Sequence, residues 1–138
     1  MALRYGSRSR PGTMVSTWLN GLVSGTAVSG AGYFGGGRVS GFTKVTTVDK
    51  FAFPTDGRTT LGTGLSAANG QLAGVANSGT AGYFGGGSDA SGLVTWVDKF
   101  AFADDSRTTI SATLTVARKQ LAGMANSGTA GYFGGGAT

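Results

Sequence analysis

Carboxylates are the only side chains in this sequence that could carry acid–base chemistry near neutral pH. All 6 acidic residues are Asp, and the 138-residue chain contains no Glu, His or Cys. The lack of His removes the usual general base, and the lack of Cys removes thiolate nucleophiles, disulfides and Cys-ligated zinc. The composition therefore argues against most enzyme chemistry, and we expect no catalytic residue and no cofactor.

A pair of carboxylates could in principle serve a glycosidase. Asp49 and Asp98 are candidates by type, but both lie in the motif Val-Asp-Lys-Phe-Ala-Phe, 49 residues apart. Equivalent positions in two repeats do not provide the asymmetric acid and base that catalysis requires. The neighbouring Asp104 and Asp105 could contribute to a calcium site, but the EF-hand spacing is absent. We therefore expect these two residues to form a turn, and we expect no metal site.

Three runs of Gly could suggest a phosphate-binding loop. They occupy residues 35–37, 85–87 and 134–136, and Tyr-Phe precedes each run. A phosphate-binding P-loop requires Lys-Ser/Thr after its glycines and then a helix, whereas Arg38-Val39 and Ser88-Asp89 follow the first two runs. Recurrence of the whole Tyr-Phe-Gly-Gly-Gly unit indicates a structural role for these glycines.

Internal repetition is the strongest pattern in the sequence. The segments 72–87 and 121–136 differ only at Val75 and Met124, and residues 22–37 form a weaker copy. A period near 50 residues is typical of propellers, solenoids and repeat arrays. A second motif, Val-Asp-Lys-Phe-Ala-Phe, is followed in both copies by Arg-Thr-Thr, and these elements occupy residues 48–53, 58–60, 97–102 and 107–109.

Each period reads as four short strands. In the central repeat we expect strands at residues 72–76, 80–84, 94–102 and 108–114, with Asn, Asp, Ser and Gly marking the turns. Helical periodicity is absent. The sequence therefore predicts an all-β fold of four-stranded antiparallel repeats. We divide the chain into a basic arm at residues 1–12 and a repeat domain at residues 13–138. The domain contains repeats at residues 22–71, 72–120 and 121–138, of which the last is incomplete.

The repeated Gly and aromatic residues suggest how such sheets pack. Gly allows backbones to approach closely where sheets converge, and Tyr and Phe can fill the wider gaps. We expect structural roles for the repeated positions Tyr33, Tyr83, Gly35, Gly36, Gly85, Gly86, Gly134 and Gly135.

These motifs resemble kelch-type β-propeller repeats. The Gly-Gly doublet within residues 85–87, the aromatic strand Val97–Phe100 and Arg118 before the next repeat carry the resemblance, which covers roughly residues 22–138. Two departures point to a divergent subgroup. Arg-Thr-Thr stands where a Trp is expected after the third strand, and Asn69 replaces the Arg in the earlier copy.

The units Gly-Tyr-Phe-Gly-Gly-Gly and Val-Asp-Lys-Phe-Ala-Phe also look like those of glycine-rich repeat proteins of bacteriophages. That resemblance implies a virion structural or fibre component. The number of repeats sharpens this expectation, because about 2.5–3 blades per chain are fewer than the four to eight of closed propellers. We expect an open edge at residues 129–136 that recruits another strand, so that several chains form a ring or dock onto a lattice. A filament and a compact monomeric β-sandwich are the alternatives.

The basic residues near the start of the chain suggest how it could dock. The net charge of the chain is +5, and Arg4, Arg8 and Arg10 belong to the excess of basic residues that precedes the first Asp. Such an arm can bind an acidic protein surface or nucleic acid, or it can be a solvated tail. We select as interface candidates these three Arg residues, two Trp residues that break the repeat and two aromatic residues at the open edge: Trp18, Trp96, Tyr132 and Phe133.

The sequence thus predicts a non-enzymatic virion structural protein, as a capsid decoration, tail or fibre component. We expect it to form homo-oligomers and to bind other virion proteins, with nucleic acid contacted only through the arm. A glycan-binding propeller lectin, with sugar stacked on Trp96 or on the repeated Tyr residues, and an extracellular filament subunit are the alternatives. We expect no signal peptide and no membrane partner, because no stretch approaches the roughly 20 apolar residues of a membrane span. We expect the protein in the virion, after assembly in the host cytoplasm.

Overall fold

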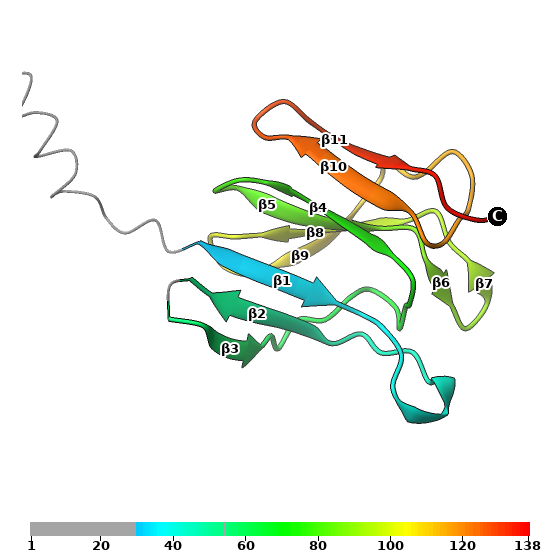
Figure 1. Cartoon of the computed structure of the whole chain (residues 1–138), viewed down its shortest axis with the longest axis horizontal. Helices are drawn as coiled ribbons and strands as arrows, with labels where there is room; N and C mark the ends of the chain where they lie inside the picture. The colour runs from blue at the N-terminus through cyan, green and yellow to red at the C-terminus, as the bar shows by residue number, and fades with distance from the viewer. Residues whose placement is uncertain (1–29, 54) are drawn as a thin grey trace, which may run out of the picture.

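The computed structural model describes residues 30–53 and 55–138, where the regular structure is almost entirely β-strand. This part of the chain contains eleven strands and one 3-10 helix, η1 (Ser40–Phe42). Figure 1 shows the strands gathered into stacked sheets. The prediction of an all-β fold is confirmed. Within the described ranges, no helix has the length and apolar character needed to cross a membrane.

Three antiparallel sheets follow one another along the chain. The first sheet has the order β1-β2-β3, the second β4-β5-β8-β9, and the third contains β10 and β11. A small two-stranded hairpin, β6-β7, projects from the second sheet (Figure 1). The strands are β1 (Ala31–Gly35), β2 (Val48–Ala52), β3 (Gly57–Thr60), β4 (Ala73–Asn77), β5 (Ala81–Gly85), β6 (Ser88–Asp89), β7 (Gly92–Leu93), β8 (Val97–Ala101), β9 (Arg107–Ile110), β10 (Ala122–Asn126) and β11 (Ala130–Gly134).

The registers show that the sequence repeat is also a structural repeat. Tyr33 lies opposite Lys50 in the first sheet, and Tyr83 lies opposite Lys99 in the second. The hairpins β4-β5 and β10-β11 likewise pair equivalent residues along their whole length. Four-stranded antiparallel pairing is complete in the second sheet, as the sequence predicts for one repeat. The resemblance also implies a closed propeller, but none of the described sheets closes on itself.

Two strand predictions differ from the structure in their bounds. The predicted strand 94–102 is shorter in the structure, where β8 begins at Val97, and the hairpin β6-β7 comes before it. The predicted strand 108–114 ends at Ile110. Leu114 instead donates its backbone N–H to the carbonyl of Thr95, at 2.8 Å. The third strand therefore begins later than predicted, and the fourth ends earlier, because Leu114 bonds the connection before β8.

The second and third glycines of each run need a backbone that other residues rarely adopt. Gly36, Gly86 and Gly135 have φ values of +69°, +64° and +70°. A Cβ atom at Gly86 would lie 2.6 Å from the Leu121 side chain and 2.8 Å from the carbonyl oxygen of Arg118. Positive φ and close approach together require Gly at this turn. The glycine run therefore has one defined turn conformation in the structure.

Stacking explains why one sequence has three different environments. The same five residues, Ala-Gly-Tyr-Phe-Gly, form β1, β5 and β11. Four of the five are buried in β5, whereas none is fully buried in β1 or β11. The second sheet lies between the other two, so one of its faces is covered by the first sheet and part of the other face by the third (Figure 1).

Candidate assembly interface

The main hydrophobic core lies between the first and second sheets. Its buried members are Val48, Leu65, Phe84 and Phe100. Phe84 and Phe100 come from neighbouring strands of the second sheet and pack edge to face, with ring centroids 5.8 Å apart. Side chains alternate along a strand, so the Phe residues of each sheet share one face, which we call its aromatic face, and the Tyr residue points to the other face. The aromatic face of the second sheet is therefore buried against the first.

A glycine in each sheet makes room for a phenylalanine of the next. A Cβ atom on Gly35 would lie 3.1 Å from the ring of Phe84, and one on Gly85 would lie 3.1 Å from the ring of Phe133. The first glycine of the run thus acts in packing between sheets, unlike the two that follow it. The same contact occurs at both sheet-to-sheet interfaces, so the stacking itself is repeated.

Asp98 is the most deeply buried charged residue among the described ones, with no exposed surface. Its carboxylate accepts hydrogen bonds from the backbone N–H and the hydroxyl of Ser66, at 2.7 and 2.9 Å, and from the hydroxyl of Thr109, at 2.6 Å. The Arg107 guanidinium lies 3.6 Å away. A buried carboxylate requires such partners, and Ser66 belongs to the preceding repeat. Asp98 therefore joins two repeats.

The contact of an Asp with the Arg and Thr of the neighbouring strand explains why the Arg-Thr-Thr motif recurs. Asp49 accepts a hydrogen bond from Thr60 at 2.5 Å and faces Arg58 at 3.4 Å. This arrangement is equivalent to that of Asp98 with Thr109 and Arg107. The Asp of one motif and the Arg and last Thr of the next thus form one cross-strand unit. Sequence reasoning missed this pairing, although the constant spacing of the two motifs was the signal that could have revealed it.

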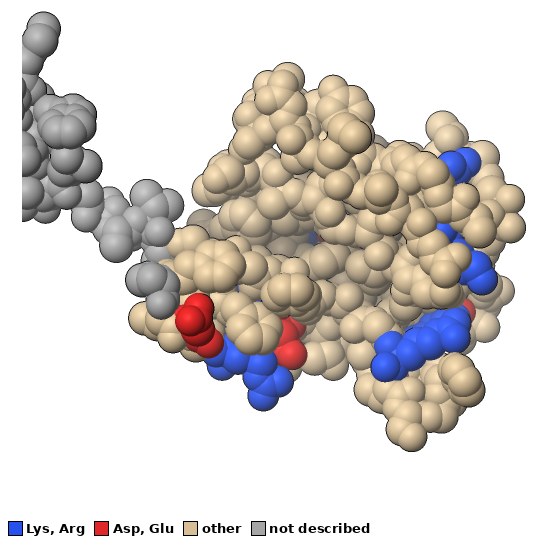
Figure 2. All heavy atoms as spheres, viewed as in Figure 1, with Lys and Arg blue, Asp and Glu red and all other residues tan. Residues whose placement is uncertain are grey.

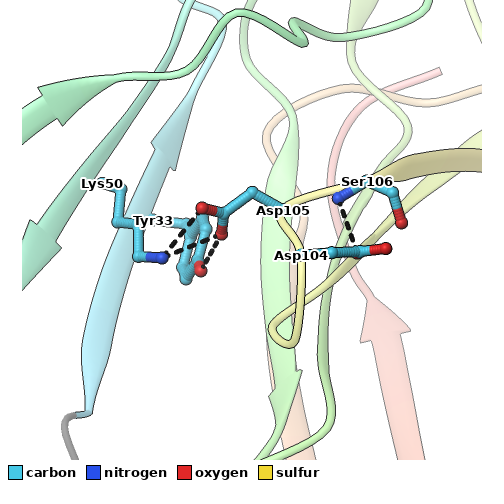
Figure 3. A network of polar contacts seen from close by, with 5 residues as sticks. All are labelled: Tyr33, Lys50, Asp104, Asp105 and Ser106. Atoms are coloured by element: carbon cyan, nitrogen blue, oxygen red, sulfur yellow. Dashed lines mark hydrogen bonds and ion pairs between the residues drawn. The ribbon is translucent and has the colours of Figure 1, made fainter.

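Tyr33 and Lys50 of the first sheet reach the second sheet together (Figure 3). The Tyr33 ring stacks on Phe102, with centroids 5.0 Å apart and an interplanar angle of 18°. Its hydroxyl donates to Asp105 Oδ1 at 2.5 Å, and Lys50 Nζ lies 2.8 Å from Asp105 Oδ2. Asp105 stands in the turn between β8 and β9 with φ +57°. We call this set of four residues the Tyr-Lys-Asp latch.

The latch changes the ionisation of two of its members. Burial raises the pKa of Tyr33, and the hydrogen bond to the Asp105 carboxylate raises this pKa further. The hydrogen bond to Asp105 also raises the pKa of Lys50. Both shifts favour the protonated side chain, because protonated Tyr33 and Lys50 can donate to one carboxylate. The two residues therefore act as a pair of donors.

Asp104 has a different role from its neighbour. Its Oδ1 atom accepts the backbone N–H of Ser106 at 3.0 Å (Figure 3). Hydrogen bonds from Ser106 hold the pKa of Asp104 below its usual range. The side chain thus bonds its own backbone two residues on, which is typical of Asp in a turn. The structure places both Asp104 and Asp105 in the turn that the sequence predicted.

A third contact between repeats passes through the glycine turns. Asn69 Nδ2 donates to the carbonyl of Gly86 at 2.7 Å, and the Arg118 guanidinium donates to the carbonyl of Gly135 at 2.9 Å. These positions are equivalent in the repeat. Asn69, which departs from the expected Arg, therefore makes the same kind of contact with a shorter side chain.

The two outer sheets expose residues whose equivalents in the second sheet are buried or half-buried. On the first sheet Phe34 is 66% exposed and Phe53 is 52% exposed, whereas the equivalent Phe84 is only 7% exposed. On the third sheet Tyr132 is 56% exposed. Phe34 still packs edge to face against Phe51, at 5.4 Å, as Phe84 does against Phe100. The outer face of the first sheet (Phe34, Asp49, Phe51, Phe53) is thus an aromatic face without a neighbouring sheet among the described residues.

The predicted interface residues fall into three groups. Arg4, Arg8, Arg10 and Trp18 lie outside the described residues. Trp96 is half-buried just before β8, and its carbonyl accepts the N–H of Gly86 at 3.2 Å. Tyr132 and Phe133 lie on β11, where Tyr132 is exposed and Phe133 turns inward against the second sheet. Of the positions predicted to be structural, Gly36, Gly86 and Gly135 lie at turns, and Gly35, Gly85 and Tyr33 lie at contacts between sheets. Tyr83 lines the space between the second and third sheets, and Gly134 ends β11 with no other atom within 4 Å of a Cβ placed there.

Charged side chains occupy only part of the surface. Figure 2 shows a face on which most of the area over the sheets is neither basic nor acidic, with the charged groups near its lower and right-hand edges. Among the described residues, the face drawn there has no continuous basic stripe of the kind found at nucleic-acid interfaces. A scan of protein-family models and a search of curated protein sequences found no match to this chain.

Proposed function

We propose that this protein is a non-catalytic structural component of a phage-like particle, built from kelch-like β-repeats that assemble by stacking. One observation carries the proposal. The aromatic face that is buried where the second sheet meets the first is exposed where the first sheet meets solvent, as Phe84 at 7% and Phe34 at 66% show. A stack that exposes its own interface at its end is suited to continue with another molecule.

The third sheet supports assembly from the other end. Within the described part, β11 pairs only with β10, so its second edge offers unpaired backbone donors and acceptors. Such edges readily add a strand from another chain. Because the two ends of the stack differ, the contact between copies is head-to-tail, which gives a ring if the rotation closes. A ring of chains would supply the four to eight blades of a propeller.

The use of the polar residues supports a structural role. Asp49 and Asp98 bind the Arg-Thr-Thr motifs, and Asp105 binds Tyr33 and Lys50. These carboxylates have their partners within the protein and hold strands and sheets together. The chemistry-bearing side chains of the repeat thus stabilise its interfaces.

The native assembly tests the proposal. We would purify the full chain from its natural particle or from expression, and determine its mass and symmetry by analytical ultracentrifugation and electron microscopy. Discrete rings, or the chain as a stoichiometric part of a virion, are the expected result. A chain that stays monomeric at high concentration and is missing from purified particles would refute it.

A glycan-binding function is the second candidate, and the exposure of Tyr132 favours it. Aromatic rings exposed on a β-surface can stack on sugars. The equivalent Tyr33 is engaged by Phe102 and Asp105, so Tyr132 is the repeated tyrosine to test. Glycan-array binding that is lost in Tyr132→Ala would favour a lectin, and an array without binding would count against one. Long fibres in electron micrographs would instead indicate the filament subunit.

A further inference from the structure

A cavity of about 420 Å³ lies between the second and third sheets. Its apolar lining includes Tyr83, Val97, Ile110, Leu114 and Phe133. All five are repeat equivalents of residues that form or pack against the core between the first and second sheets, namely Tyr33, Val48, Leu61, Leu65 and Phe84. The cavity therefore occupies the place in the second interface that the hydrophobic core occupies in the first.

One component of that core is missing from the second copy. Phe100 fills the core between the first and second sheets, where it has no exposed surface. It belongs to β8, which pairs with β5. The equivalent strand in the third sheet would pair with β11, and among the described residues β11 has no partner at that edge. The cavity and the open edge thus lack the same strand.

A polar contact is missing at the same place. In the latch, Tyr33 and Lys50 bind Asp105, which follows β8 in the chain. Tyr83 and Lys99 are the equivalent pair and lie opposite each other in the second sheet. Within the ranges 30–53 and 55–138, neither forms a side-chain hydrogen bond or ion pair. Among the described residues, this place thus has no Phe, strand or carboxylate equivalent to those of the first core, and a single hairpin like β8-β9 would supply all three.

We propose that this groove binds the β2-β3 hairpin of a second copy of the chain. The hairpin has the required sequence, because Val-Asp-Lys-Phe-Ala-Phe forms both β2 and β8 with their following residues. Phe51 of the second copy enters the cavity, and its Asp56 faces Tyr83 and Lys99. Asp56 has φ +54°, nearly the backbone conformation of Asp105 at +57°. The carboxylate also complements the charge of Lys99.

The hairpin becomes available by strand exchange, in which β11 of one copy takes the place of β1 beside β2 of the second copy. The strands β1 and β11 have the same sequence, so β11 can pair with β2 of the second copy in the register that β1 uses. The resulting sheet, β10-β11 with β2-β3, has the same four-stranded order as the second sheet. Exchange of an identical element between chains is a common route to oligomers. The inference rests on the proposed function, since it names the contact through which copies assemble.

Synthetic peptides test the groove directly. We would measure the binding of two peptides to the full chain by titration calorimetry: residues 48–61, which contain the proposed β2-β3 hairpin, and residues 97–110, which contain the equivalent strands β8 and β9. We expect saturable binding at one site, and a peptide with Phe100→Ala should bind roughly 100-fold more weakly. A folded chain that does not bind the peptide of residues 48–61, including one whose own residues 1–29 fill the groove, would overturn the proposal.

The carboxylate contact has its own control. A peptide with Asp105→Asn should bind the wild-type chain roughly 10-fold more weakly, because a hydrogen-bonded charge is lost. The same change should have little effect on binding to a chain with Tyr83→Phe and Lys99→Met. Equal losses for both chains would show that the peptide binds elsewhere, and would refute the docking geometry.

Cross-linking tests whether a second copy is the natural occupant. The chain has no Cys, and Ala31 lies opposite Ala52, so Ala130 would lie opposite Ala52 of the second copy. The Ala52→Cys/Ala130→Cys chain should form intermolecular disulfides, whereas Ala31→Cys/Ala52→Cys should form an intramolecular one. Excess peptide should suppress the intermolecular product.

Peptide binding without intermolecular cross-links would reject the second copy as occupant, even if particle assembly supports the proposed function. Cross-linking without particle assembly would instead reject the function and keep the groove.

Discussion

Tyr33 and Asp105 are 72 residues apart in sequence, and the phenolic hydroxyl of one donates to the carboxylate of the other at 2.5 Å. The contact joins the second strand of one repeat unit to the last turn of the next. Lys50 shares the same carboxylate, so one Asp holds two strands of the neighbouring sheet. The latch is therefore a second side-chain contact between these two repeats, beside the hydrogen bonds of Ser66 to Asp98.

Removing the tyrosine hydroxyl should measure this contact. Tyr33→Phe keeps the ring stacked on Phe102 and should lower the free energy of unfolding by about 1–2 kcal/mol, because a hydrogen bond to a charged group is lost. Tyr83→Phe is the matched control and should change it by less than about 0.5 kcal/mol. Urea denaturation gives both values. Equal losses in the two variants would show that Asp105 adds nothing at Tyr33.

The latch should weaken at high pH. Both Tyr33 and Lys50 have a pKa raised in the folded protein, so their contribution is present below their unfolded pKa values and is lost as pH rises through the folded values. We expect the free energy of unfolding to fall above about pH 10, where Tyr and Lys ordinarily titrate. Thermal denaturation between pH 8 and about 11.5 should show a steeper decline for the wild type than for Tyr33→Phe/Lys50→Met. Parallel curves would contradict this account.

The two equivalent aspartates should differ in their contribution to stability. Asp98→Asn removes a buried charge bound by three hydrogen bonds and should cost about 3 kcal/mol. Asp49→Asn changes a partly exposed residue with fewer partners and should cost about 1 kcal/mol or less. Chemical denaturation of both variants provides the comparison. A larger loss for Asp49 would mean that its outer face is buried in the native assembly.

The repeated phenylalanines provide a similar test of stacking. Phe100→Ala should lower the free energy of unfolding by about 3–5 kcal/mol, because it opens a cavity in the core. Phe51→Ala, at the equivalent position on the outer face of the first sheet, should cost about half as much or less. Denaturation at low protein concentration, where copies are separate, is the measurement. The loss for Phe51 should rise with protein concentration if copies stack through that face.

Gly35 and Gly134 occupy equivalent positions in different environments. A Cβ atom on Gly35 would crowd the ring of Phe84, whereas one on Gly134 would have no atom within 4 Å. Gly35→Ala should therefore lower the free energy of unfolding by about 1–3 kcal/mol, as overpacking does. Gly134→Ala should be neutral or raise it by about 0.5 kcal/mol, because Ala restricts the unfolded chain. Similar losses at both positions would show that the first glycine is needed for the strand itself.

Much of the fold could be predicted from the sequence, because local rules determine it. Alternating short strands, turn residues and the repeat predict the antiparallel hairpins, and the structure confirms the hairpins β4-β5 and β10-β11. The ends of the strands were less predictable. Leu114 looks like a continuation of β9, but its backbone bonds Thr95 in the connection that precedes β8. A bond to a residue distant in sequence decided that boundary.

The candidate interface required more than local rules. The sequence indicated that Tyr33, Tyr83 and the repeated glycines are structural, since they recur. It did not indicate that Asp105, excluded as a calcium ligand, would bind Tyr33 and Lys50, or that Asp98 would bind Ser66. Both contacts join side chains of different repeats, and their formation depends on how one sheet is placed on the next.

The sequence alone therefore determined the all-β repeat, the positions of its turns and the recurrence of its glycines. These properties follow from backbone geometry and from periodicity, which act within one repeat. The tertiary structure decided which copy of each residue is buried. Phe34 and Phe84 occupy the same position in the repeat, yet one is exposed and the other is enclosed. The physical reason is stacking, because the environment of a strand depends on which sheets cover its two faces.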